Sequence, residues 1–152
     1  LTEMGIKVEE VEDSLIVNGG SKVLKANIKT LPYPGFPTDL HPQIASLLCM
    51  ADGTSTITEG IWDTRFQYVE ELKRMGANIK VEGRMAVIEG VPGLTGAPTN
   101  AMDLRAGAAL VIAGLVAKGK TEIRNVCYID RGYENLEVKL RALGADIKRY
   151  RT

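Results

Sequence analysis

This chain is poor in several kinds of residue, and each scarcity excludes a class of site. It has only two cysteines, one histidine and one tryptophan in 152 residues. The cysteines stand apart in apolar surroundings, so neither a metal-binding cysteine pattern nor a disulfide framework is present. We therefore expect Cys49 and Cys127 to be buried small hydrophobic residues in a reducing compartment. We expect no metal and no cofactor.

Net charge and long apolar runs are absent as well. The 19 basic and 19 acidic residues cancel, which argues against broad electrostatic binding to nucleic acid or to an anionic membrane. No apolar run approaches the roughly 20 residues needed to span a bilayer, and no signal peptide is visible. Apolar content of 45% and charged content of 25% are ordinary for a globular domain. The composition thus predicts a cytoplasmic globular protein with no nucleic-acid or membrane partner.

The chain does contain a repeated pattern, and we expect the pattern to begin partway through a unit. Gly5, Gly76 and Gly144 each directly precede an alternating, strand-like segment. A helical stretch precedes the second and third glycines, whereas only four residues precede the first. Related segments recur at spacings of 64 to 68 residues, too long for a solenoid repeat. The predicted units are the end of a truncated repeat (1–24), a second repeat (25–91) and a third (92–152).

Each full unit is predicted to run β-α-β-α-β-β. The stretch 104–117 is too apolar for a surface helix and should be buried, and Gly107 and Gly114 within it indicate close packing against a neighbour. Thr38 or Asp39 is expected to cap the helix that follows. The result is an α/β fold with strands outside packed helices. Expected strands are 5–11, 14–17, 26–30, 54–61, 78–81, 85–89 and 121–129, with the start of another at 145–150; expected helices are 40–51, 66–75, 104–117 and 133–143.

Two kinds of charged residue recur where these elements meet. An Asp opens the first helix of each full unit, at Asp39 and Asp103, and an Arg follows a strand, at Arg65 and Arg131. Arg105 lies in the first turn after Asp103. An arginine at a helix N-terminus opposes the helix dipole, so we infer that an anion is held there between guanidinium and backbone N–H groups. Several converging arginines would suit a small, multiply charged ligand.

Each of these residues also has an ordinary structural explanation. Asp at a helix N-terminus is commonly only a cap, and a single Arg in a loop is commonly a solvated surface residue. His41, in the first turn of its helix, is more simply structural or exposed than catalytic. Trp62 is more simply a packing residue than a ligand platform. None of these signals is strong alone.

Five motifs are specific when they are taken together: Phe36–Asp39, Thr64–Phe66, Asp103–Ala106, Ile129–Glu134 and Lys139–Ala145. With these motifs the chain resembles, over essentially its whole length, the C-terminal part of the UDP-N-acetylglucosamine 1-carboxyvinyltransferase (MurA) family. The sister family, 3-phosphoshikimate 1-carboxyvinyltransferase, shares the repeated fold but typically has a Lys-Glu-Ser-Asp-Arg-like segment where this chain has Asp-Arg-Gly-Tyr-Glu. The first family is therefore favoured and the sister is the alternative.

The resemblance implies a fold and a reaction. Family members have two domains, each an inside-out α/β barrel of three repeats, and this chain would supply most of the C-terminal domain. They transfer the enolpyruvyl group of phosphoenolpyruvate to the 3′-hydroxyl of UDP-N-acetylglucosamine and release phosphate, the first committed step of peptidoglycan synthesis, without a metal. The catalytic Cys loop belongs to the N-terminal domain, the implied missing partner. We therefore expect the isolated chain to be inactive.

The resemblance also assigns roles to individual residues. Asp39, next to Thr38, matches the residue that contacts the sugar hydroxyl, and is the candidate general base. Ile61 matches a position whose backbone contacts the nucleotide sugar. Asp103 matches a second acidic residue near the reacting carbon. The arginines that match those around the carboxylate and phosphate of phosphoenolpyruvate are Arg65, Arg105 and Arg131.

Two departures from the family pattern affect only the details of the sugar pocket: Trp62 replaces a commoner Phe, and His41 replaces a commoner Gln. Two further classes of function remain open. A nucleic-acid-binding or scaffolding module is disfavoured by the zero net charge and the few aromatic residues. The second class is a regulatory paralogue that keeps the fold but does not turn over substrate.

Overall fold

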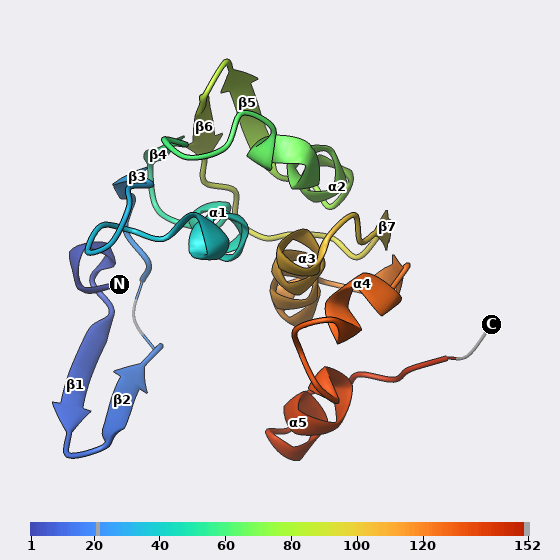
Figure 1. The fold of residues 1–152 in the computed structure, drawn as a ribbon. Coiled ribbons are helices and arrows are strands. Elements are labelled where there is room, and N and C mark those ends of the chain that lie inside the picture. Colours follow the sequence, from blue (N-terminus) through green and yellow to red (C-terminus); the bar gives the residue numbers. More distant parts are fainter. Residues whose placement is uncertain (21, 151–152) are drawn as a thin grey trace.

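Two packed helices form the middle of the protein, and strands lie around them (Figure 1). In this computed structural model, which describes residues 1–20 and 22–150, α1 (His41–Leu48) and α3 (Leu104–Val116) make the most extensive contact between any two elements. Leu48 of α1 and Leu110 of α3 are fully buried in the main hydrophobic core. This helix pair brings the starts of α1 and α3 close together, although they are distant in the sequence.

The largest sheet has four strands in the order β3-β4-β6-β5. β3 is parallel to β4, whereas β6 is antiparallel to both of its neighbours. Ile57 of β4 and Ile88 of β6 point into the core and are fully buried. The strands are β3 (Asn27–Lys29), β4 (Thr54–Thr58), β5 (Asn78–Glu82) and β6 (Met85–Glu89).

Two separate strand pairs flank this core. β1 (Lys7–Val11) and β2 (Ser14–Asn18) form an antiparallel hairpin that projects away from the four-stranded sheet (Figure 1). Every residue of β2 is exposed. β7 (Pro98–Asn100) and β8 (Glu122–Arg124) are parallel and lie beside α3.

Short helices connect the strands. Gly76 and Gly144, with φ of 91° and 96°, follow α2 and α5, and the predicted glycine stops of these two helices are confirmed. No helix within the described ranges is long and apolar enough to cross a membrane. The short elements are η1 (Thr2–Met4), η2 (Thr38–Leu40), η3 (Arg65–Tyr68), α2 (Val69–Arg74), α4 (Cys127–Asp130) and α5 (Leu136–Ala142), where η denotes a 3₁₀ turn.

The glycines inside α3 permit close packing, as predicted. A Cβ on Gly107 would lie 2.4 Å from Cγ1 of Ile129, so α4 approaches the helix where a side chain is missing. A Cβ on Gly114 would lie 3.3 Å from the Thr121 side chain. The prediction that α3 is buried is confirmed for one face only, because Leu115 and Val116 are about half exposed.

Several local predictions are wrong. The expected strand 121–129 ends at Arg124, because Asn125 adopts a φ of 58° and turns the chain into the helical turn α4. Cys127 in that turn is exposed, whereas Cys49 is buried as expected. The expected strand at 145–150 is not formed. The N-cap of α1 is Leu40 and, among the residues that the structure describes, no side-chain hydrogen bond caps this helix, so Thr38 and Asp39 are not its N-cap. The mixed α/β class itself is confirmed.

Candidate active site

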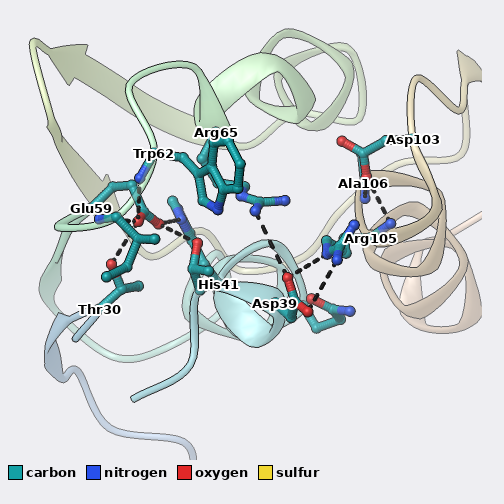
Figure 2. Close-up of polar contacts among 12 residues, drawn as sticks. Thr30, Asp39, His41, Glu59, Trp62, Arg65, Asp103, Arg105 and Ala106 are labelled. Carbon is teal, nitrogen blue, oxygen red and sulfur yellow. Dashed lines mark hydrogen bonds and ion pairs between the residues drawn. The ribbon is translucent and has the colours of Figure 1, made fainter. Parts of the chain in front are cut away.

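Asp39 lies between two arginines that come from different elements (Figure 2). Arg105, in the first turn of α3, donates from Nε to Oδ1 of Asp39 at 2.5 Å and from Nη2 to Oδ2 at 3.0 Å. Arg65, in η3, places its Nη2 3.8 Å from the same Oδ1. The contact between α1 and α3 therefore assembles a charged cluster from residues that are far apart in the sequence.

The electrostatics of this cluster favour anions. The hydrogen bond from Arg105 lowers the pKa of the Asp39 carboxyl, partial burial opposes this, and the charges of Arg105 and Arg65 lower the pKa further. The same hydrogen bond raises the pKa of Arg105. Asp39 and Arg105 are thus charged near neutral pH. One carboxylate between two guanidinium groups leaves a net positive charge, which attracts a negatively charged ligand.

Arg65 has one buried hydrogen-bond donor that is unpaired within the described residues. Its side chain is only 10% exposed, and its Nε has no hydrogen-bond partner among the described residues. Its guanidinium lies 5.6 Å from the ring centroid of Trp62, which is itself 56% exposed. A buried donor without a partner is destabilising, so an acceptor that reached this nitrogen would be bound favourably. Trp62 therefore covers Arg65 rather than packing in the core.

Asp103 is the N-cap of α3, which is the ordinary role of an Asp at a helix N-terminus. Its Oδ1 accepts hydrogen bonds from the backbone N–H groups of Arg105 at 2.7 Å and Ala106 at 2.8 Å. The expectation that an anion is held by these N–H groups at the helix start is therefore wrong, because Asp103 already occupies them. The cap instead orients the turn that carries Arg105.

Arg131 lies apart from the Asp39 cluster. No hydrogen bond or ion pair links it to these residues in the described part of the chain, and its guanidinium lies over the ring of Tyr128 at 5.1 Å. Two residues further on, the hydroxyl of Tyr133 accepts a hydrogen bond from Nε2 of Gln43 on α1, at 3.2 Å. The segment that follows Arg131 therefore contacts α1, whereas Arg131 itself contacts Tyr128.

An open pocket of about 580 Å³ adjoins Asp39. The predicted substrate-binding residues Thr38, Asp39 and Ile61 all line it. The rest of its wall is the proline-rich loop that precedes Thr38, so a mostly apolar surface ends at a carboxylate. Such a surface suits a sugar ring with a hydroxyl directed at Asp39. The loop residues in the wall are Leu31, Pro32, Tyr33, Pro34, Gly35 and Pro37.

Glu59 is a second polar centre, and nothing in the composition or spacing of the sequence marks it as one. It directly follows β4 and its side chain is fully buried. The expected strand 54–61 included Glu59, but β4 ends at Thr58. The only available signal is an acidic residue near the end of a β-branched stretch, directly before Gly60. Its hydrogen-bond donors are Thr30, Thr38, His41, and the backbone N–H groups of Ile61 and Trp62 (Figure 2).

His41 is structural, as expected. It is fully buried, with Nδ1 2.7 Å from Glu59 and Nε2 2.8 Å from the hydroxyl of Tyr68. Burial lowers the pKa of His41 more than Glu59 raises it, and Arg65 adds to the lowering. The ring is therefore neutral. Because Glu59 can only accept, Nδ1 carries the hydrogen and Nε2 accepts from Tyr68.

Sequence comparisons place this chain among enolpyruvyl transferases. The family model described as EPSP synthase (3-phosphoshikimate 1-carboxyvinyltransferase) matches residues 1–140. A protein named UDP-N-acetylglucosamine 1-carboxyvinyltransferase 3, from Caldanaerobacter subterraneus subsp. tengcongensis, is 59% identical over 151 residues. That alignment covers 99% of this chain but 36% of the relative. The chain thus spans about a third of the length of this curated relative.

Solved structures agree on the fold. The enolpyruvyl transferase NikO from Streptomyces tendae superposes with a TM-score of 0.88 at 30% identity, covering 97% of this chain and 34% of its own. An EPSP synthase from Acinetobacter baumannii superposes with a TM-score of 0.71 at 19% identity, covering 98% of this chain and 35% of its own. At that identity the second match speaks for the fold alone.

Proposed function

This chain belongs to the EPSP synthase (3-phosphoshikimate 1-carboxyvinyltransferase) family, and we propose that it forms part of an enzyme that transfers the enolpyruvyl group of phosphoenolpyruvate to the 3′-hydroxyl of UDP-N-acetylglucosamine, releasing phosphate. The observation that carries the choice of acceptor is the 59% identity, over nearly the whole chain, to a protein of that name. The reaction belongs to peptidoglycan synthesis. Its two substrates are multiply charged and do not cross membranes unaided, so the proposed setting is the cytoplasm.

Asp39 is the proposed general base. It would accept the proton of the 3′-hydroxyl as that oxygen forms a bond to C2 of phosphoenolpyruvate while C3 gains a proton. The tetrahedral adduct then loses a proton from C3 and the C2–O bond to phosphate breaks, which restores the double bond. The position of Asp39 in the wall of the sugar-sized pocket supports this role.

Arg65 and Arg105 are the proposed anion-binding groups. A carboxylate or phosphate of phosphoenolpyruvate would draw the guanidinium of Arg105 away from Asp39 and would reach the unpartnered Nε of Arg65. Loss of the Arg105 hydrogen bond lets the pKa of Asp39 rise, which makes its carboxylate a better base. Phosphoenolpyruvate binding would thus make Asp39 more basic in the state in which it accepts the proton.

The remaining site residues have supporting roles in this proposal. Ile61 gives its N–H to Glu59, so its carbonyl oxygen is the group that would contact the nucleotide sugar, and Thr38 holds the turn beside Asp39. Asp103 orients Arg105 through the cap of α3 and would handle a proton only if it left that cap. Arg131 would reach phosphoenolpyruvate by moving from its position over the ring of Tyr128.

The rest of the active site is proposed to lie outside this chain. In the proposed enzyme this chain, residues 1–152, is most of the C-terminal domain, an inside-out α/β barrel of repeats, and an N-terminal domain contributes the catalytic Cys loop. The pocket beside Asp39 is open on one side, so water would reach the reacting groups in the isolated chain. The isolated chain is therefore proposed to be inactive.

The second candidate is transfer to shikimate 3-phosphate, the reaction in the name of the matching family model. Both reactions release phosphate from phosphoenolpyruvate, and they differ only in the acceptor. The test is therefore phosphate release by the full-length protein with each acceptor offered separately.

A further inference from the structure

Glu59 joins the two segments that carry the proposed substrate residues. Its Oε1 accepts from the backbone N–H groups of Ile61 at 2.8 Å and Trp62 at 3.1 Å. Its Oε2 accepts from the hydroxyl of Thr38 at 2.9 Å. Thr38 and Ile61 stand in the wall of the same pocket. One buried carboxylate therefore binds two separate segments of that pocket's wall, and Figure 2 shows it with Thr30, His41 and Trp62 around it.

Further contacts hold Glu59 itself in place. Thr30, after β3, donates to Oε1 at 2.7 Å, and His41 donates from Nδ1 to Oε2 at 2.7 Å. His41 is in turn oriented by Tyr68, on the turn that carries Arg65. The carboxylate has no freedom to rotate, because each oxygen is bound from two or more directions. Its position is transmitted to Asp39 through the adjacent Thr38.

A buried carboxylate could serve the stability of the fold alone, and Glu71 offers the comparison within this chain. The Glu71 side chain is 8% exposed and pairs with Arg74 at 3.7 Å. It accepts one backbone hydrogen bond, from Asn100 at 3.0 Å. None of these groups lines the pocket. Glu59 differs from Glu71 because two of its hydrogen bonds come from residues of the pocket wall, Thr38 and Ile61.

We propose that Glu59 is a positioning residue for enolpyruvyl transfer. It holds the Thr38 turn so that Asp39 faces the arginines, and it holds the Ile61–Trp62 backbone so that Ile61 lies in the wall of the same pocket. Trp62 lies three residues before Arg65 in the sequence. The same carboxylate therefore fixes the position of Asp39, the proposed base, relative to Arg65, a proposed anion-binding group. This inference rests on the proposed function for the reaction that it serves.

The test is Glu59→Ala in the full-length protein, with Glu71→Ala as the matched control. Both variants remove a buried carboxylate and should lower the melting temperature. Only Glu59→Ala should lower kcat/KM for UDP-N-acetylglucosamine, by about 100-fold per folded enzyme, because a displacement near 1 Å at the reacting groups has an effect of this size. A Glu59→Ala enzyme that folds and keeps the kinetic constants of Glu71→Ala overturns the inference but leaves the proposed function standing.

A second pair of variants applies if Glu59→Ala does not fold. His41→Gln retains an amide N–H that can donate to Glu59, whereas His41→Leu has no donor. We expect His41→Gln to restore most of the turnover that His41→Leu loses. Equal turnover in the two variants would count against positioning through Glu59.

A wild-type protein that releases no phosphate with UDP-N-acetylglucosamine overturns the proposed function instead. Crystal structures of the wild type and of His41→Leu then decide the inference. Movement of Asp39 out of the space between Arg65 and Arg105 in the variant supports positioning by the Glu59 network. An unmoved Asp39 overturns it.

Discussion

Arg105 binds both carboxylate oxygens of Asp39, through Nε at 2.5 Å and Nη2 at 3.0 Å. Bidentate pairs of this kind are strong and directional. The proposed base and the proposed anion-binding group are therefore each other's counter-ions before substrate arrives. An anionic substrate must compete with Asp39 for Arg105, which links substrate binding to the basicity of Asp39.

Replacement of the proposed base should affect the chemical step. We expect Asp39→Asn in the full-length protein to lower kcat by about 10²- to 10⁴-fold, the usual contribution of general base catalysis. Steady-state phosphate release measures this. The control is Asp63→Asn, which alters an exposed carboxylate paired with Arg84 and should leave kcat unchanged. A kcat within a factor of about two of wild type for Asp39→Asn would exclude the residue as base.

Replacement of Arg105 by lysine should separate charge from geometry. Arg105→Lys keeps the positive charge but loses the planar fork that binds two oxygens. We expect KM for phosphoenolpyruvate to rise by about 10- to 100-fold, as expected for loss of a charged hydrogen bond of about 1.5–3 kcal/mol. Arg124→Lys, at an exposed pair with Glu122, is the matched control. If KM is the same in both variants, Arg105 does not bind this substrate.

The Glu59–His41 pair predicts how stability depends on pH. Burial acts to raise the pKa of Glu59, but hydrogen bonds from Thr30, Ile61, His41 and Trp62 outweigh it and lower the value from 4.5 to about 2. As pH falls, Glu59 therefore becomes protonated near pH 4.5 in the unfolded chain but only near pH 2 in the folded protein. The free energy of unfolding should fall as pH drops through this window.

The lowered pKa of His41 also makes the folded protein less stable at low pH. This loss of stability begins as pH falls below 6.5. Urea unfolding of the full-length protein at a series of pH values measures both effects. Glu59→Ala should flatten the dependence between pH 4.5 and 2. An equally steep dependence in Glu59→Ala would contradict the assignment of this window to Glu59.

Much of the candidate site follows from the sequence, because its residues recur at the starts of helices. Asp39, Arg65 and Arg105 could be named as candidates from their places at element boundaries, and Asp103 could be named as a possible cap. Their convergence could not be derived from spacing alone. It depends on how α1 packs against α3, and the separate placement of Arg131 depends on the same tertiary contacts.

The failures of sequence reasoning have local causes. Residues 121–129 are rich in β-branched and aromatic side chains, yet the positive φ of Asn125 ends the strand early and leaves Cys127 exposed. Glu59 escaped prediction because a single acidic residue after a strand is ordinarily exposed. Only the tertiary fold brings its five donors together. The repeat boundaries and the inside-out barrel remain predictions.

The close approach of α3 and α4 predicts that two glycine substitutions in α3 differ in their effect on stability. Gly107→Ala places a methyl group 2.4 Å from Cγ1 of Ile129, and we expect it to destabilise the full-length protein by about 1–3 kcal/mol. Gly114→Ala meets Thr121 only at 3.3 Å, and the gain in helix propensity should hold its net effect below about 1 kcal/mol. Urea denaturation measures both variants. Equal stability losses would mean that Gly107 is not the contact point.

The most direct test of the central claim is phosphate release from phosphoenolpyruvate by the full-length protein, with UDP-N-acetylglucosamine and shikimate 3-phosphate offered separately. We predict release with the nucleotide sugar, none with shikimate 3-phosphate, and none with either acceptor from the isolated chain. Release with shikimate 3-phosphate alone would assign the protein to the other reaction. No release with either acceptor from a folded full-length protein would contradict the account.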